Sequence, residues 1–132
     1  MKIQQLNKSV YIASKVDISD INKLKAIGIQ SVINNRPDNE EDGQPLSGDL
    51  SEYAASINID YYYLPIASGH YPVTSVDKLT ELLSTAELPV VIFCRTGRRS
   101  INLWAKSQNK LLGAQHVLSK VQELGFEMVD IS

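Results

Sequence analysis

The sequence predicts an α/β fold with a mostly parallel central sheet and helices on both faces of that sheet. Short apolar segments typical of buried strands alternate with longer segments whose apolar residues recur at helical spacing. Strands joined through helices run parallel, and the helices cover both faces of the sheet. The run Val90–Phe93 is continuously apolar, as expected of a central parallel strand.

The first half of the chain contains three expected strands and two expected helices. Ser19 or Asp20 can cap the first helix through a side-chain oxygen, and Gly28 ends it. In chain order we expect strands Ile3–Leu6 and Val10–Ala13, a helix with apolar positions Ile21, Leu24 and Ile27, the buried strand Ile29–Asn34, the polar loop Asn35–Gly48, and helix Leu50–Ile57.

The second half continues the alternation. Thr74 with Asp77 resembles a capping box at the start of a helix. In chain order we expect strand Ile59–Leu64, the loop Pro65–Pro72, a helix with apolar positions Val76, Leu79, Leu82 and Leu83, strand Val90–Phe93, a helix from Ser100, helix Gln115–Leu124, and a tail or edge strand at Phe126–Ile131.

Composition limits the classes of protein to consider. The 132 residues, 43% of them hydrophobic and 21% charged, predict a single ordered domain over residues 1–132. A net charge of −2 disfavours nucleic-acid binding, and no apolar run reaches membrane-spanning length. The N-terminus turns polar at once, so we expect a soluble cytoplasmic protein. One cysteine and two histidines predict no internal disulfide and no metal site, and we expect no cofactor.

The strongest functional signal is the segment Cys94-Arg95-Thr96-Gly97-Arg98-Arg99-Ser100, which joins the Val90 strand to the next helix. Ligand sites of α/β sheets lie beyond the carboxyl ends of the strands. The first N–H groups of the helix lack intrahelical partners, and together with the helix dipole they favour an anion. The same field favours the nucleophilic thiolate form of Cys94.

The other residues of the loop complete a predicted anion site. Gly97 lets the amides turn inward, and Arg99 can hold an anion through two parallel hydrogen bonds. Ser100 can donate a hydrogen bond to the sulfur. A lone cysteine after an apolar strand is often only a small buried residue, but this combination favours a nucleophile. We therefore expect Cys94, Arg99 and Ser100 to be catalytic, and Arg95, Thr96, Gly97, Arg98, Arg36 and His70 to bind the anionic substrate.

Three segments together carry a family resemblance: Gly28–Asp38, Tyr62–Ile66, and the Cys94 loop followed by Leu103-Trp104-Ala105. With these segments the chain resembles the beta-lactamase hydrolase-like, phosphatase-like domain family (DUF442). The family is related to dual-specificity tyrosine phosphatases, so the resemblance implies a dual-specificity-phosphatase-like fold for nearly the whole chain. Arg98 departs from the smaller residue expected at its position, which makes the mouth of the site more basic.

The spacing within the loop points to a different chemistry. Tyrosine phosphatases carry Cys-x5-Arg, whereas only four residues separate Cys94 from Arg99, which is similar to the rhodanese sulfurtransferases. We therefore expect a sulfurtransferase in which Cys94 takes the sulfane sulfur of thiosulfate or glutathione persulfide and holds it as a persulfide. The resemblance also implies a persulfide dioxygenase as a partner.

Two alternatives remain open. The first is a cysteine-dependent phosphatase, whose leaving group needs a proton that phosphatases supply from an Asp. The loop Pro65–Pro72 contains no Asp, although His70 could substitute. The second is a non-catalytic anion-binding or thiol redox-sensing module.

Arg36 and the acidic residues that follow it can each be interpreted in two ways. Arg36 either binds an anionic group of the substrate or forms a turn with Asp38. The acidic residues around it, Asp38, Glu40, Glu41 and Asp42, are more typical of a solvated loop than of a metal site.

Overall fold

The expected strands pair into one five-stranded sheet in the computed structural model, which describes residues 1–128. The sheet order is β1-β2-β5-β3-β4, with β1 antiparallel to β2 and the other neighbours parallel. The central strand is therefore β5, as its apolar run predicts. The strands are β1 (Lys2–Gln5), β2 (Val10–Ser14), β3 (Ser31–Asn34), β4 (Asp60–Tyr63) and β5 (Val90–Cys94).

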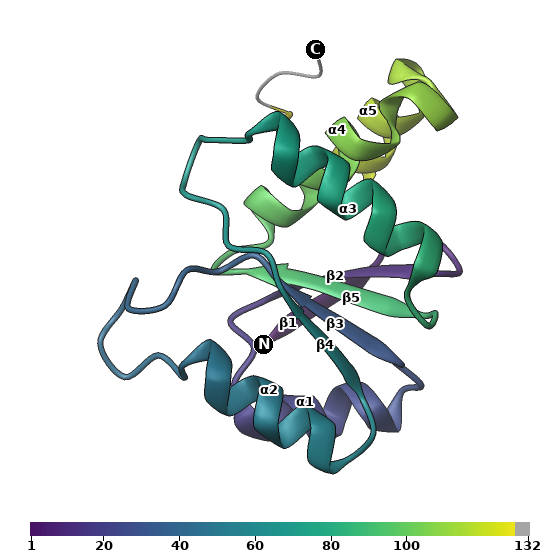
Figure 1. Cartoon of the computed structure of the whole chain (residues 1–132). Helices are drawn as coiled ribbons and strands as arrows, with labels where there is room; N and C mark the ends of the chain where they lie inside the picture. Colours follow the sequence, from purple (N-terminus) through teal and green to yellow (C-terminus); the bar gives the residue numbers. More distant parts are fainter. Residues whose placement is uncertain (129–132) are drawn as a thin grey trace.

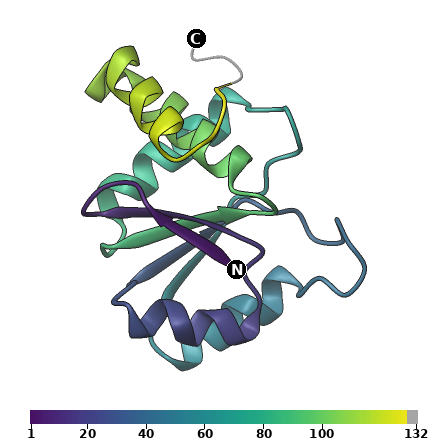
Figure 2. The same ribbon diagram turned by 180° about the vertical axis from the view of Figure 1, so that it is seen from behind.

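Helices cover both faces of the sheet, as expected for parallel strands joined by crossovers (Figures 1 and 2). One face carries α1 (Ile18–Ala26) and α2 (Ser47–Ser56). The other carries α3 (Val73–Thr85), α4 (Arg98–Leu112) and α5 (Ala114–Glu123). The α/β architecture predicted from the sequence is therefore confirmed.

Alternate side chains of β5 supply both layers of the core. Val90 and Ile92 pack with buried residues of α3, α4 and α5, including Trp104 of α4. Val91 and Phe93 point the other way and pack with residues of α1 and α2. Because a strand with both faces buried needs apolar residues at every position, β5 reads as a continuous apolar run rather than an alternating one.

The caps of two helices differ from the prediction. The N-cap of α1 is Asp17, whose side chain accepts a hydrogen bond from the Asp20 amide at 3.0 Å while Asp20 bonds back to the Asp17 amide. The first residue before α3 is Pro72, and no side chain caps that helix, so the capping box of Thr74 and Asp77 is wrong. Proline needs no donor there and restricts the chain to an extended entry into the helix.

Two features of the C-terminal part of the chain also differ from the prediction: the start of the α4 helix and the final segment. Helix α4 begins at Arg98, two residues before the predicted start at Ser100, and α5 spans Ala114–Glu123. The tail or edge strand expected at Phe126–Ile131 is irregular over residues 126–128, and its remainder lies outside the described residues.

Candidate active site

Cys94 is the last residue of the central strand, at the edge of the sheet where the parallel strands end. Both neighbouring strands continue into segments that bond to this end of β5. The Lys15 amide donates to the Cys94 carbonyl at 3.0 Å, and the Asn35 amide donates to the Phe93 carbonyl at 2.8 Å. Cys94 itself is 0% exposed, so the loop that follows β5 encloses its side chain.

Gly97 brings a backbone amide to the sulfur. Its N–H donates to Cys94 Sγ at 3.1 Å, and its φ of +93° lies in the left-handed region that favours glycine. A Cβ at this position would lie 3.0 Å from Phe126 Cζ and 3.2 Å from Ile12 Cγ2. Gly97 is also the N-cap of α4, so the loop delivers an amide at the start of the helix, as predicted.

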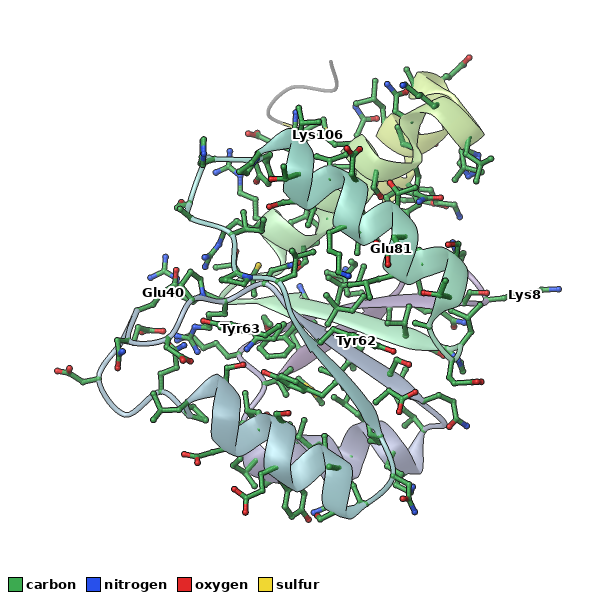
Figure 3. The ribbon with its side chains drawn as sticks, viewed as in Figure 1. Lys8, Glu40, Tyr62, Tyr63, Glu81 and Lys106 are labelled. Atoms are coloured by element: carbon green, nitrogen blue, oxygen red, sulfur yellow. The ribbon has the colours of Figure 1, made fainter. Side chains whose placement is uncertain are left out.

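Arg99 is held by an acidic side chain that comes from another loop. Its Nη1 and Nη2 atoms donate to the two carboxylate oxygens of Glu40 at 2.7 and 2.9 Å, and Nη1 also donates to the Ile66 carbonyl at 2.8 Å. The Arg99 side chain is 9% exposed. In Figure 3, Glu40 lies in the loop that follows β3.

These bonds leave one edge of the guanidinium available. Of its five N–H groups, two on Nη1 and one on Nη2 are engaged by Glu40 and Ile66. Within the described chain, the N–H of Nε and the second N–H of Nη2 make no hydrogen bond. Those two groups are parallel, which is the arrangement that matches two oxygens of a phosphate or carboxylate.

The ion pair changes the titration of both partners. Hydrogen bonding to Arg99 outweighs burial and lowers the pKa of Glu40 from its ordinary value of 4.5. Burial alone would lower the pKa of Arg99, but the hydrogen bonds and charge of Glu40 raise it. The pair is therefore fully charged at neutral pH.

Arg36 forms a further ion pair with Glu40, the partner of Arg99. Its Nε donates to Glu40 Oε1 at 3.3 Å, and its Nη2 is paired with Glu41. The Arg36 side chain is only 6% exposed. Asp38, the expected partner in a turn, instead accepts a hydrogen bond from the Ser47 amide at 2.7 Å. In this structure Arg36 therefore orients Glu40 and Glu41, and its predicted contact with substrate stays a prediction.

Ser100 has a different partner from the one predicted. Its hydroxyl donates to Asn35 Oδ1 at 2.9 Å, and Asn35 Nδ2 donates to the Leu64 carbonyl at 2.8 Å. Both residues are fully buried. A hydroxyl has a single hydrogen, so in this structure Ser100 does not direct it to the sulfur of Cys94.

The remaining predicted binding residues line the outside of the loop. Arg95, Thr96 and Arg98 are exposed, and the Arg98 amide donates to Thr96 Oγ1 at 3.3 Å. His70 is exposed in the loop before α3, where its amide donates to the Ala67 carbonyl at 3.0 Å. The structure thus gathers Cys94, Gly97 and Arg99, and leaves Arg95, Arg98 and His70 at the surface.

Two residues of the site were missed by sequence reasoning. Glu40 was interpreted as part of a solvated acidic loop, although it is the principal partner of Arg99. Tyr71 lies close enough to the site that, after burial, the negative charge of a Cys94 thiolate raises the pKa of its phenol. Its position next to the histidine in the loop before α3 is the signal that could have drawn attention to it.

Metal binding and membrane insertion have no structural support within residues 1–128. No group of three or more His, Cys, Asp or Glu side chains is arranged to hold a metal ion in that part of the chain. None of the helices described is long and apolar enough to cross a membrane.

Residues 2–111 match the family described as "Beta-lactamase hydrolase-like protein, phosphatase-like domain". The chain belongs to this family. The beta-lactamase hydrolase-like protein of Agrobacterium fabrum is 32% identical over 104 residues, and that of Xylella fastidiosa is 28% identical over 110. These matches cover 79% and 82% of this chain but 24% and 25% of the relatives. The chain thus spans about a quarter of the length of these curated relatives.

Solved structures share the fold. A candidate phosphatase from Neisseria meningitidis has a TM-score of 0.84 at 26% identity, with 96% of this chain and 91% of that one covered. PTPMT1 in complex with PI(5)P has a TM-score of 0.79 at 11% identity, covering 98% and 88%. TpbA of P. aeruginosa in complex with pTyr has a TM-score of 0.70 at 16% identity, covering 98% and 76%.

These findings overturn the predicted sulfurtransferase. The family is phosphatase-like and its match includes the Cys94 loop, so the four-residue spacing between Cys94 and Arg99 does not indicate rhodanese chemistry. The spacing was misleading because the anion-binding edge of Arg99 is set by Glu40 and Ile66, and not by the number of loop residues alone. The persulfide dioxygenase partner expected beside that chemistry has no support in these comparisons.

Proposed function

We propose that this domain is a cysteine-dependent phosphatase that hydrolyses phosphate monoesters. The observation that carries the proposal is the pair of parallel N–H groups that Arg99 keeps free while Glu40 and Ile66 hold the rest of its guanidinium. Together with the Gly97 amide at Cys94 Sγ, they form a cradle for a phosphoryl group beside a thiolate. Membership of a phosphatase-like family supports the same chemistry.

The reaction follows from the roles of these groups. The Cys94 thiolate attacks phosphorus, an S–P bond forms, and the P–O bond to the leaving group breaks. The leaving oxygen takes a proton from an acid or from water. Water then attacks the phosphocysteine, which restores the thiolate and releases inorganic phosphate. Arg99 and the loop amides stabilise the charge on the equatorial oxygens in both steps.

The test is phosphate release from 4-nitrophenyl phosphate, because this leaving group needs little help from an acid. The wild type is expected to turn over and Cys94→Ser to lose all measurable turnover while still binding phosphate. Arg99→Lys should weaken phosphate binding, since an ammonium cannot present two parallel donors. Phosphate release that persists at the wild-type rate in Cys94→Ser would reject the mechanism.

A chemical trap separates this activity from simple anion binding. Acid quenching during turnover should leave a phosphoryl group on Cys94, visible by mass spectrometry of the intact protein. Phosphotyrosine and a phosphoinositide are the first natural esters to try, because TpbA binds pTyr and PTPMT1 binds PI(5)P in solved structures of this fold. Phosphate binding without an adduct or turnover would instead support the non-catalytic anion-binding module.

A further inference from the structure

A groove of about 710 Å³ lies between α3 and α4. Its lining side chains come from the first turns of α3 and the last turns of α4. Tyr71, from the loop before α3, and Leu111, near the end of α4, both line it. In Figure 3, Lys106 lies on this helical layer, on the opposite side of the sheet from α1 and α2.

The loop before α3 connects the groove to the catalytic loop. Its Ile66 carbonyl accepts a hydrogen bond from Arg99 Nη1 at 2.8 Å, and its Tyr71 lines the groove. Lys106 Nζ lies 5.5 Å from the centre of the Tyr71 ring, within cation–π range. Because α4 starts at Arg98 and rises about 1.5 Å per residue, the groove leads away from the loop along the helix.

The walls of the groove suit an apolar occupant. Val73 is 74% exposed and Leu111 is 78% exposed, and Val76 contributes a further apolar side chain. Such exposure of large aliphatic residues on facing walls of one groove is typical of a binding surface.

Two of the hydroxyl groups that line the groove, those of Thr80 and Ser107, have partners within the helices. Thr80 Oγ1 donates to the Val76 carbonyl at 3.0 Å, and Ser107 Oγ donates to the Trp104 carbonyl at 2.8 Å. The walls are helices, whose backbone groups are bonded internally, so they offer little to the backbone of an extended peptide. A hydrocarbon chain needs no such partners, and the exposed Val73 and Leu111 favour it over an extended phosphopeptide.

We propose that the groove binds the apolar tail of an amphiphilic phosphate monoester while its phosphate occupies the Cys94 loop. The proposal rests on the proposed phosphatase function and narrows its substrate class. The exposed Arg95 and Arg98 attract the anionic head, and the two lysines of α4 that line the groove, Lys106 and Lys110, extend the basic surface along the tail. Their aliphatic stems add apolar contact.

The experiment measures binding in the Cys94→Ser variant of this 132-residue chain, so that it does not depend on turnover. Dissociation constants for ethyl phosphate and decyl phosphate are determined by calorimetry below the concentration at which decyl phosphate forms micelles. We expect decyl phosphate to bind at least about tenfold more tightly, since even two or three buried methylenes suffice for that ratio.

Variants in the first turn of α3 test whether the groove causes this preference. Val73→Asp and Val76→Asp should each remove most of the decyl advantage. Ile27→Asp is the matched control, because Ile27 is a 52% exposed aliphatic residue at the end of α1, on the other face of the sheet. The decyl advantage should survive in this control. Circular dichroism melting would confirm that all three variants fold.

The outcomes separate this inference from the function on which it rests. Equal affinity for the two esters, or a decyl advantage that persists in both groove variants, would overturn the groove proposal and leave the phosphate site intact. Binding of neither ester would overturn both proposals. Dependence on Val73 for a tyrosine phosphopeptide but not for decyl phosphate would assign the groove to peptides instead.

Discussion

At the residue scale, the state of Arg99 depends on Glu40. The two side chains share a bidentate pair of 2.7 and 2.9 Å, and the Ile66 carbonyl takes a third N–H at 2.8 Å. A long flexible arginine would otherwise sample many rotamers, at an entropic cost when it binds an anion. Glu40 therefore acts as a positioning residue that presents the free Nε and Nη2 edge to the substrate.

Glu40→Ala should lower kcat/KM for 4-nitrophenyl phosphate by about 10- to 100-fold, since hydrogen bonds to charged groups contribute roughly 1.5–3 kcal/mol. Glu41→Ala is the control, because Glu41 pairs with Lys15 and Arg36 and makes no contact with Arg99. Affinity for phosphate, measured in the Cys94→Ser background, should fall for Glu40→Ala alone. Equal losses of kcat/KM in the two variants would show that Glu40 supports only the fold of the acidic loop and does not position Arg99.

Ser100→Ala tests the hydrogen bond that replaced the predicted one. Removal of the hydroxyl leaves Asn35 Oδ1 buried without its donor, so the free energy of unfolding should fall by about 1–3 kcal/mol in urea titrations. The rate at which iodoacetamide alkylates Cys94 in the folded protein, after correction for the unfolded fraction, should stay at the wild-type value. The reason is that the hydroxyl does not point at the sulfur. Ser84→Ala provides a baseline from an exposed serine of α3. Slower alkylation of Cys94 in Ser100→Ala would instead indicate that the Ser100 hydroxyl does donate to the sulfur, as the sequence predicts.

The residues of the loop could be predicted from the sequence, and those that support it could not. Cys94, Gly97 and Arg99 lie within one short segment, and their spacing after an apolar strand carries the chemical signal. Glu40 lies 59 positions before Arg99 along the chain, and only the folded sheet brings the two together. Surrounding acidic residues made Glu40 look like one of several solvated carboxylates.

At the scale of single elements, the turn from β5 into α4 depends on the absence of a side chain at residue 97. Gly97 and Gly113 mark the two ends of α4, and both have positive φ, +93° and +88°. A Cβ on Gly97 would crowd Ile12 and Phe126, whereas one on Gly113 would meet nothing within 4 Å. The two positions therefore differ in packing, although both need a positive φ.

Gly97→Ala should lower activity more than Gly113→Ala. Both variants place an alanine at a positive φ, which destabilises the fold, but only Gly97→Ala adds close contacts with Ile12 and Phe126 beside Cys94. Activity should fall in Gly97→Ala because the amide that bonds Cys94 Sγ at 3.1 Å must shift. Urea denaturation and phosphate release report the two effects. Similar losses in both variants would mean that the loop adapts without strain.

Element boundaries were predicted well where apolar spacing defines them and less well where a cap does. The strand Val90–Cys94 exceeds the expected Val90–Phe93 by one residue, because Cys94 continues the pairing with Ser14. At α3 the pattern Thr74 and Asp77 suggested a cap, yet the helix begins directly after Pro72. Several polar residues near a helix start can each satisfy the capping pattern, and tertiary packing selects among them.

At the scale of the whole molecule, topology explains why one edge of the sheet carries the site. The order β1-β2-β5-β3-β4 places β5 between β2 and β3, so the loops after all three strands converge on Cys94. Alternating strands and helices were enough to predict this edge. The chemistry was not predictable from the loop length, because the same short loop presents an anion-binding arginine only after the β3 loop supplies Glu40.

The same long-range pair links stability to pH. The folded pKa of Glu40 is lowered, chiefly by its hydrogen bond to Arg99, so the folded state binds its proton less readily than the unfolded state does. The stabilisation is therefore fully present above the ordinary pKa of 4.5 and is lost as the pH falls below that value through the folded pKa.

Replacing the carboxylate should flatten this part of the pH dependence. Wild type and Glu40→Gln are compared by urea unfolding from about pH 7 to about pH 3, and Glu52→Gln on α2 serves as an exposed control. The stability gap between wild type and Glu40→Gln should be constant at neutral pH and should narrow below the ordinary pKa of glutamate. The gap for Glu52→Gln should stay small throughout. A gap for Glu40→Gln that is unchanged in acid would mean that the Arg99 pair does not respond to protonation of Glu40, and that other contacts hold the arginine in place.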